Sequence, residues 1–184
     1  MRLYLVRHGR PDVAQGICYG GTDLTVAPQE HARVVAALLP LLPEQAPVFS
    51  SPLRRCSELA TRLAASRRSG SVNYDARLAE MHFGEWEMRA WDDIPRTEID
   101  AWAGDVAAYH PGGGECVLQV AQRVRSFHDE LQLQNHESAV VVCHAGTIRL
   151  LAICRQLATP MEMALNAART RHAIAYGELV IVDC

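Results

Sequence analysis

The sequence predicts an α/β fold: a three-layer sandwich with a mainly parallel sheet, helices on both faces and an antiparallel C-terminal edge. The first observation behind this prediction is that short buried-strand patterns alternate with one-faced helical patterns, which is typical of right-handed βαβ units. The second is a pair of C-terminal strand patterns joined at Gly177-Glu178 like a hairpin. The third is size, because 184 residues, 49% of them hydrophobic, suit one domain with a sizeable core.

The chain opens with a strand pattern and a long loop. Leu3–Val6 is an unbroken apolar run, which predicts a short strand buried on both faces. Residues 10–25 are rich in Gly, Pro and Asp, and long loops after sheet strands often cover functional sites. We expect Thr25 to cap the following helix, with Pro28 in its first turn.

A second strand and a second helix follow. Val48–Ser50 predicts the strand, and Ser51-Pro52 predicts the cap and first residue of a helix that runs to about Arg68. Arg54 and Arg55 then fall in the first turn of this helix, where cations oppose the helix dipole. A bound anion would resolve that conflict, whereas the alternative is that both arginines are simply solvated. Adjacent helical residues point about 100° apart, so only one of the two can face the sheet's carboxyl edge.

The middle of the chain changes character. Extended segments are expected at Val72–Tyr74 and Arg77–Glu80. Residues 84–114 then lose clear periodicity and carry three tryptophans and a Pro-Gly-Gly-Gly run. We therefore expect an irregular, cap-like insertion here, within a single domain spanning residues 1–184.

The C-terminal third returns to clear patterns. Apolar residues spaced three or four apart between Val117 and Leu131 form one stripe, which predicts a helix. Ser138–Cys143 predicts a buried strand, and a further helix is expected to run through Leu157. The two strands of the expected hairpin are Ala173–Tyr176 and Leu179–Asp183.

Composition and charge argue against several classes of protein. A net charge of −3 and a pI near 6.2 give no electrostatic reason to expect nucleic acid or an anionic membrane surface. The six cysteines are scattered without a C-x-x-C pair, so neither a disulfide framework nor a zinc ribbon is expected. No segment has the length of a membrane span, and the N-terminal apolar run is too short for a signal peptide. We expect a cytoplasmic protein without nucleic-acid or membrane partners.

Two of the strand patterns end in the same way. Arg7-His8-Gly9 follows the first strand, and His144-Ala145-Gly146 follows the strand at Ser138–Cys143. Open α/β sheets bind ligands at the carboxyl ends of their strands, so we expect both imidazoles in one pocket. The alternative is that each histidine merely ends a strand and faces solvent. Together with Arg7 and either Arg54 or Arg55, the two histidines would form a site suited to phosphate. Each guanidinium group can bind two phosphate oxygens at a time. The arginine charge argues against a divalent metal between the histidines.

Four ordered blocks of sequence carry a family resemblance. They are Arg7-His8-Gly9, Ser51-Pro52-Leu53-Arg54-Arg55-Cys56, Leu78 to Glu87, and Val142 to Arg149, and together they span nearly the whole chain. This set resembles the histidine phosphatase, or phosphoglycerate mutase-like, superfamily. The Glu80–Arg89 block and Pro111–Glu115 look most like the α-ribazole phosphatases of cobalamin synthesis. The resemblance implies the phosphoglycerate mutase-like fold, a covalent phosphohistidine intermediate, metal-independent hydrolysis of a phosphomonoester, and no cofactor.

The resemblance also implies a role for each candidate residue. The implied catalytic set is His8, Glu80, Arg7, Arg55 and His144. His8 would take the phosphoryl group, and Glu80 would protonate the leaving oxygen and then deprotonate the attacking water. The arginines and His144, with Ala145 beside them, would hold the three equatorial phosphoryl oxygens. The alternative for Glu80 is a solvated carboxylate at a strand end. Arg55 is chosen over Arg54 because the family's arginine directly precedes a small residue, here Cys56.

Some positions depart from the family pattern or stand outside it. An acidic residue commonly follows Arg-His-Gly in the family, whereas this chain has Arg10-Pro11. A family Asn that often contacts phosphate aligns with Ala14, so Arg10 is a candidate to replace it, or else a solvated loop arginine. His82 is a further candidate, because it would share a strand face with Glu80 if the expected strand continues past Glu80. Trp86 or Trp91 is a candidate for stacking on a heterocyclic substrate, and the alternative is that the tryptophans form the core of the insertion.

Several functions stay open at this point. The expected substrate is α-ribazole 5′-phosphate, with a broad sugar or nucleoside phosphatase or a phosphoglycerate mutase as alternative enzymes. A non-catalytic phosphoryl-binding or partner-docking module is the alternative from another class. The expected partner is a small phosphomonoester, and the oligomeric state stays open, a homodimer being among the options.

Overall fold

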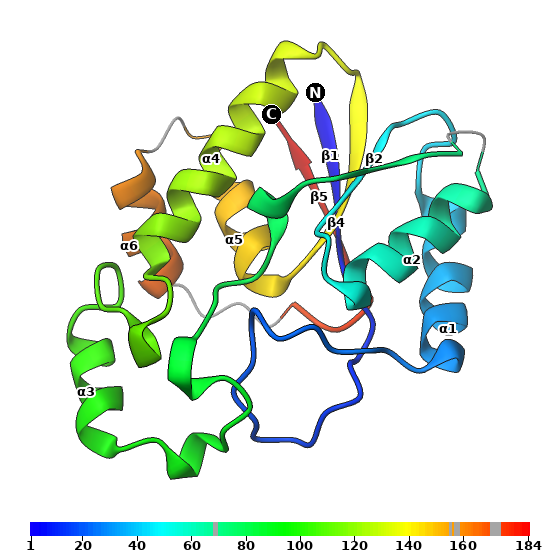
Figure 1. Cartoon of the computed structure of the whole chain (residues 1–184). Coiled ribbons are helices and arrows are strands. Elements are labelled where there is room, and N and C mark those ends of the chain that lie inside the picture. Colours follow the sequence, from blue (N-terminus) through cyan, green and yellow to red (C-terminus); the bar gives the residue numbers. More distant parts are fainter. Residues whose placement is uncertain (68–69, 155, 157–158, 170–173) are drawn as a thin grey trace.

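The computed structural model describes residues 1–67, 70–154, 156, 159–169 and 174–184. Its sheet has five strands in the order β3-β2-β4-β1-β5 (Figure 1). The strands are β1 (Arg2–Arg7), β2 (Val48–Ser50), β3 (Val72–Tyr74), β4 (Ser138–Cys143) and β5 (Leu179–Asp183). The first four pair in parallel, and β5 pairs antiparallel with β1. The predicted mainly parallel sheet with an antiparallel C-terminal edge is confirmed.

Helices cover both faces of this sheet. They are α1 (Pro28–Leu38), α2 (Arg54–Ala65), α3 (Arg96–Gly104), α4 (Val117–Leu133), α5 (Ala145–Cys154) and α6 (Pro160–Arg169). In Figure 1, α1 and α2 lie on one side of the sheet and α4, α5 and α6 on the other, while α3 lies beyond the carboxyl edge of the strands. The expected three-layer arrangement is therefore present. No helix in these described ranges is long and apolar enough to cross a membrane.

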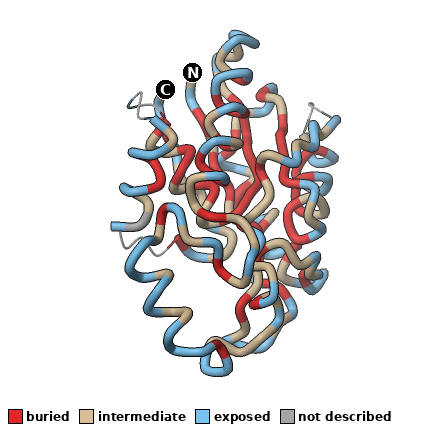
Figure 2. The backbone as a smooth tube through the Cα atoms, turned by 60° about the vertical axis from the view of Figure 1, so that its left-hand side comes forward, coloured by how far each residue is buried: buried red, intermediate tan, exposed pale blue. Residues whose placement is uncertain are grey.

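The two core layers follow from the alternation of side chains along each strand. In β1, Leu3 and Leu5 face the cluster built on α4, α5 and α6, whereas Val6 faces the cluster built on α1 and α2. In β4, Val141 belongs to the first cluster and Val140 to the second. Figure 2 shows this buried centre in red. Strands that are apolar on both faces in this way are typical of parallel sheets with helices on each side.

Two helices begin later than the sequence indicates. Thr25 does not cap α1, because its carbonyl accepts a hydrogen bond from the Asp12 amide, and the cap residue is Ala27. Ser51 does not cap α2, because its amide extends the sheet by donating to the Val142 carbonyl. Helix α2 therefore begins at Arg54, and its predicted end at Arg68 lies outside the described residues.

Two predicted extended segments are wrong. Arg77–Glu80 is not a strand, because Ala76–Leu78 forms a 3₁₀ turn whose capping Asp75 accepts from the Arg77 amide at 2.8 Å. The hairpin is also wrong for 174–176, which is not a strand, although β5 lies where its second strand was expected. The amide of Gly177 instead donates to the carbonyls of Arg7 and His8. Ala173 and Leu157 lie outside the described residues.

The segment 84–114 is more regular than its sequence indicates, because it contains α3 and several short 3₁₀ turns. Its apolar side chains form a third cluster around Trp86, Ile94 and Cys18, the last of which belongs to the 10–25 loop. Backbone hydrogen bonds join Cys18 to Met88 and Arg89, each at 2.8 Å. The loop and the insertion are thereby held together at the carboxyl edge of the sheet (Figure 1).

Candidate active site

The register of β1 on β4 brings the two predicted histidines together. Arg7 pairs with Cys143, so His8 and His144 are the next residues on adjacent parallel strands. The His8 amide donates to the Cys143 carbonyl at 3.2 Å, and the ring centroids lie 5.1 Å apart in an edge-to-face arrangement. Both imidazoles are buried, with exposed fractions of 2% and 1%. The pair therefore occupies one site at the carboxyl edge of the sheet.

The tautomer of His8 follows from its contacts. Nδ1 lies 2.7 Å from the Gly9 carbonyl oxygen, which can only accept, so Nδ1 carries the hydrogen and Nε2 keeps its lone pair. Burial, and then the positive charge of Arg55, lower the pKa of His8 to about 3. The imidazole is therefore neutral at pH 7 with a free ring nitrogen, which is the form that a nucleophile requires.

His144 has the opposite tautomer. The Arg55 Nε–H can only donate and lies 3.3 Å from His144 Nδ1, so the hydrogen of His144 is on Nε2. Nε2 donates to the Ser51 hydroxyl at 2.9 Å. Burial first, and then the neighbouring His8 and Arg55, hold the pKa of His144 well below its usual range. Sequence reasoning missed Ser51 as a site residue, although a small polar residue directly after a buried strand was a usable signal.

Of the two arginines at the start of α2, Arg55 lies in the site. Its side chain is fully buried and donates through Nη1 to the Thr22 carbonyl at 2.7 Å and through Nη2 to the Gly20 carbonyl at 2.5 Å. With the bond to His144, these contacts use one N–H on each nitrogen and leave one N–H on each terminal nitrogen. Arg54 is exposed and pairs with Glu58 instead.

Arg7 lies beside His8 and packs on an aromatic ring. Its guanidinium carbon lies 3.9 Å from the ring centroid of Tyr176, and Nη1 donates to the Ile174 carbonyl. Its Nε is buried and has no hydrogen-bond partner among the described residues, so a donor is available for a ligand. The Tyr176 ring is also 5.7 Å from the His8 ring. Tyr176 lies at the end of a segment predicted as a strand, and no sequence pattern pointed to it as a site residue.

Glu80 lies against the start of α5, the helix that follows His144. Its Oε2 accepts from the Gly146 amide and its Oε1 from the Met81 amide, both at 3.2 Å. A Cβ at Gly146 would lie 2.5 Å from Glu80 Oε1, so a larger residue there would displace this carboxylate. Burial raises the pKa of Glu80, although these two amides oppose the shift. A carboxyl with a raised pKa can hold a proton for transfer at less acidic pH than a free one. Ala145, beside His144, is the first residue of α5.

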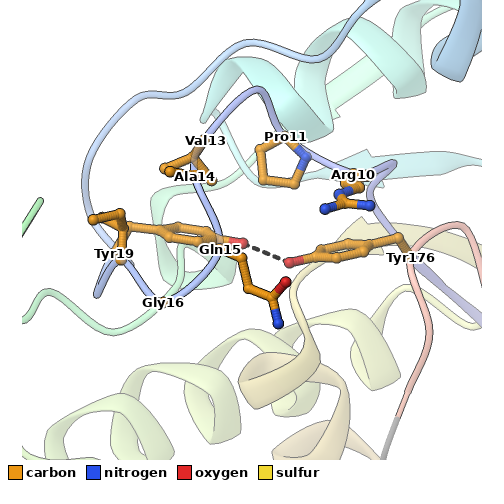
Figure 3. A pocket seen from close by; sticks show the side chains of 9 residues that line it. Arg10, Pro11, Val13, Ala14, Gln15, Gly16, Tyr19 and Tyr176 are labelled. Carbon is orange, nitrogen blue, oxygen red and sulfur yellow. Dashed lines mark hydrogen bonds between the residues drawn. The ribbon is translucent and has the colours of Figure 1, made fainter. Parts of the chain in front are cut away.

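A cavity of about 450 Å³ lies next to this cluster (Figure 3). Its lining includes Arg10, Ala14, Gln15, Tyr19 and Tyr176, and the two tyrosine hydroxyls lie 2.7 Å apart. Tyr176 is therefore a wall shared by the cavity and the Arg7–His8 pair. The lining contains no acidic side chain, and Arg10 supplies its one cationic group. Arg10 thus lies near Ala14, although only its backbone amide has a described partner, the Glu30 carboxylate at 3.0 Å.

Two weaker candidates from the sequence do not fit the structure as expected. Trp86 is fully buried in the third aromatic cluster, and its indole N–H donates to Glu98 at 2.7 Å, so the expectation that it stacks on a substrate is wrong. His82 is exposed and lies on no strand, because the chain there is irregular, so the shared strand face with Glu80 is also wrong. Its Nδ1 accepts from the Gly84 amide at 3.0 Å. The described residues contain no cluster of three or more His, Cys, Asp or Glu that could hold a metal ion.

Two neutral imidazoles, two guanidiniums and a half-buried carboxyl at the edge of a parallel sheet define an anion site suited to a phosphoryl group. Comparison with known families agrees with this class. Residues 3–183 match the model of the histidine phosphatase superfamily (branch 1), and the chain belongs to that superfamily.

Several proteins similar to this chain are named as phosphatases. The chain is 34% identical to the adenosylcobalamin/alpha-ribazole phosphatase of Escherichia coli, over 88% of this chain and 82% of that protein. It is 33% identical to the glucosyl-3-phosphoglycerate phosphatase of Mycolicibacterium vanbaalenii, over 82% of this chain and 72% of that protein. Among solved structures, a mycobacterial glucosyl-3-phosphoglycerate phosphatase complexed with VO3 superposes with a TM-score of 0.79 and 28% identity, covering 98% and 91% of the two chains. The phosphoglycerate mutase-like fold is thereby confirmed, and the relatives support a phosphatase.

Proposed function

We propose that this protein hydrolyses phosphomonoesters through a phosphohistidine formed on His8, without a metal ion. The observation that carries the proposal is the tautomer of His8: its Nδ1–H is tied to the Gly9 carbonyl, and its neutral Nε2 is free beside two arginines. Arg7 and Arg55 retain N–H donors that no described residue uses, and these would bind the phosphoryl oxygens. His144 and Ala145 would complete the set around the phosphate.

The reaction has two balanced steps. In the first, the Nε2 lone pair of His8 attacks phosphorus, the P–O ester bond breaks, and Glu80 gives its proton to the leaving oxygen. In the second, Glu80 takes a proton from water as the water oxygen attacks phosphorus, and the P–N bond breaks to restore neutral His8. The raised pKa of Glu80 supports this double role, because the acid form is needed first and the base second.

For the substrate we propose α-ribazole 5′-phosphate, with the cavity beside Tyr176 holding the leaving group. The relatives at 32–34% identity that act on this ester support the choice, and the tyrosine walls of the cavity offer an apolar surface for a flat heterocycle. Arg10 would contribute a donor to the phosphate or to the leaving group. A glucosyl-3-phosphoglycerate ester is the second candidate, because Arg10 would pair with its carboxylate.

The decisive experiment is hydrolysis of p-nitrophenyl phosphate in EDTA, followed by an alkaline denaturing quench to detect the labelled, acid-labile phosphohistidine. We expect turnover in EDTA, loss of both turnover and label in His8→Ala, and turnover and labelling retained in His136→Ala, which lies outside the site. Glu80→Gln should still bind phosphate and should slow turnover by about 10²–10⁴-fold. Loss of turnover to EDTA would indicate a metal site instead, and phosphate binding without turnover would indicate a binding module.

A panel of substrates distinguishes the alternative enzyme activities. We expect kcat/KM for α-ribazole 5′-phosphate to exceed that for glucosyl-3-phosphoglycerate and simple sugar phosphates by about tenfold or more. Equal values across the panel would identify a broad phosphatase. Isomerisation of 3-phosphoglycerate with a trace of bisphosphoglycerate, without release of phosphate, would identify a mutase.

A further inference from the structure

The carboxylate of Glu87 collects an unusual number of hydrogen bonds. Its Oε2 accepts from the amides of Gly20 and Thr22, both at 3.1 Å, and from the Thr22 hydroxyl. Its Oε1 accepts from the amides of Gly21 at 2.8 Å and Phe83 at 2.9 Å. Four of these five donors belong to three consecutive residues, which we call the Gly20–Thr22 loop. Glu87 is therefore a fixed anchor for the amide side of that loop.

The carbonyl side of the same loop faces the catalytic cluster. The Gly20 and Thr22 carbonyls accept from the two terminal nitrogens of Arg55, and these bonds fix the plane of its guanidinium. The Nε of that plane then points to Nδ1 of His144. One peptide segment thus connects the carboxylate of Glu87 to the guanidinium that the proposed reaction uses.

The loop has little room to adopt another position. A Cβ on Gly20 would lie 1.9 Å from the Met81 carbonyl oxygen, and one on Gly21 would lie 2.4 Å from the His82 ring. The loop is therefore pressed against the 81–83 segment on one side and carries Arg55 on the other. The amides and the Thr22 hydroxyl that bind Glu87 are the polar groups that hold it there.

We propose that Glu87 is a positioning residue for Arg55: it fixes the Gly20–Thr22 loop so that the loop carbonyls aim the guanidinium at the phosphoryl group. The inference rests on the proposed function, because it assumes that Arg55 binds phosphate. Glu87 itself touches neither His8 nor His144 among its described contacts. Its effect on catalysis therefore passes through Arg55.

The chemistry explains why a carboxylate is needed. Burial works against the charge, but hydrogen bonds from Phe83, Thr22, Gly20 and Gly21 keep the pKa of Glu87 below its usual value. A carboxylate accepts at both oxygens, whereas a glutamine amide accepts at one and donates at the other. Either orientation of Gln at this position would set an NH₂ group against at least two of the N–H donors.

The test measures binding of inorganic phosphate by calorimetry, together with turnover of p-nitrophenyl phosphate. We expect Glu87→Gln to weaken phosphate binding and to lower kcat/KM by about tenfold each, as supporting residues of bound groups commonly do. The matched control is Glu85→Gln, which removes the same charge from an exposed residue two positions away. A second control is Glu98→Ala, which destabilises the aromatic cluster by removing the partner of Trp86 without touching the loop.

A double-mutant cycle with Arg55→Lys distinguishes positioning from general destabilisation. Lysine keeps the positive charge of Arg55. It lacks the planar guanidinium that binds the Gly20 and Thr22 carbonyls and His144 at the same time. We expect Glu87→Gln to have little further effect on phosphate affinity in the Arg55→Lys background. An equal loss in both backgrounds, or unchanged affinity in the Glu87→Gln protein, would overturn the proposal.

The result is separable from the proposed function. If the unmodified protein binds phosphate but hydrolyses no ester, the hydrolase proposal fails. The double-mutant cycle on phosphate affinity still tests the positioning role of Glu87. If Glu87→Gln does not fold, Thr22→Val removes only the hydroxyl donor and leaves the carboxylate in place. We then expect a smaller loss of phosphate affinity that also disappears in the Arg55→Lys background, and an undiminished loss there would contradict the positioning role.

Discussion

At the scale of single residues, the site depends on which nitrogen of each imidazole carries a hydrogen. The Gly9 carbonyl fixes His8 in one tautomer, and the Nε–H of Arg55 fixes His144 in the other. Burial then keeps both rings neutral. The same burial favours the protonated form of Glu80. One low-dielectric environment therefore favours the neutral forms of both the proposed nucleophile and the proposed acid.

This arrangement predicts an unusual dependence of activity on pH. Because the pKa of His8 is about 3, kcat/KM corrected for substrate ionisation should not fall through imidazole protonation between pH 7 and pH 5. Because the pKa of Glu80 is raised, its acid form should persist above the pH at which a free glutamate ionises, and the alkaline decline should vanish in Glu80→Gln. The measurement is a kcat/KM profile from pH 4 to pH 9. An acidic decline centred near the ordinary histidine pKa would contradict the assignment.

At the scale of elements, the carboxyl edge of the sheet is enclosed by segments that are not part of the sheet. The 10–25 loop is bonded to the insertion through Cys18 and held by Glu87, and the residues before β5 cover Arg7 with Tyr176. Close backbone approach explains the glycines in this enclosure. The loop at Gly20 has no space for any side chain.

We therefore predict that Gly20→Ala is disruptive while a control glycine is not. A methyl group 1.9 Å from the Met81 carbonyl must displace backbone, so the free energy of unfolding should fall by about 1–3 kcal/mol. Gly104, at the end of α3, has nothing within 4 Å of the position that an added methyl group would occupy and no positive φ, so Gly104→Ala should change stability by less than about 0.5 kcal/mol. Urea unfolding of the two variants checks this. Equal stabilities would show that the loop can move aside.

At the scale of the whole molecule, buried histidines link folding to pH. His8, His31, His128 and His144 are all buried, and burial is the largest cause that lowers the pKa of each. A group with a lowered pKa binds its proton more readily in the unfolded chain. The stability that these neutral histidines contribute is therefore fully present above the unfolded histidine pKa of about 6.5. This contribution is lost as pH falls below that value.

We predict that the free energy of unfolding decreases steadily from pH 7 to pH 5, before most carboxylates titrate. Below that range, the lowered pKa values of Glu30, Glu87 and Glu115 add to the loss, while the raised pKa of Glu80 acts in the opposite direction. Urea unfolding at fixed ionic strength across pH 4.5–8 measures the slope. His128→Gln, remote from the site, should reduce the slope without changing turnover. A flat profile between pH 7 and pH 5 would refute the linkage.

Much of the architecture could be predicted from local patterns. The apolar runs at Leu3–Val6 and Ser138–Cys143 and the stripe from Val117 to Leu131 each correspond to an observed element. The errors lie where a contact distant in sequence overrides the local signal. Ser51 looks like a helix cap, yet its amide bonds to Val142 of the neighbouring strand. Residues 174–176 look like a strand, yet the amide of Gly177 directly after them donates to the carbonyls of Arg7 and His8.

The sequence by itself determined the α/β class and the position of His8 and His144 at strand ends, because side-chain alternation and apolar runs are properties of contiguous residues. Tertiary structure alone decided the remainder. It selected the tautomers of the two histidines, buried Trp86 in the third cluster, set Tyr176 against Arg7, and linked Glu87 to Arg55 through the Gly20–Thr22 loop. The physical reason is that hydrogen-bond partners and burial at this edge come from segments far apart in the chain, and only the folded packing brings them into contact.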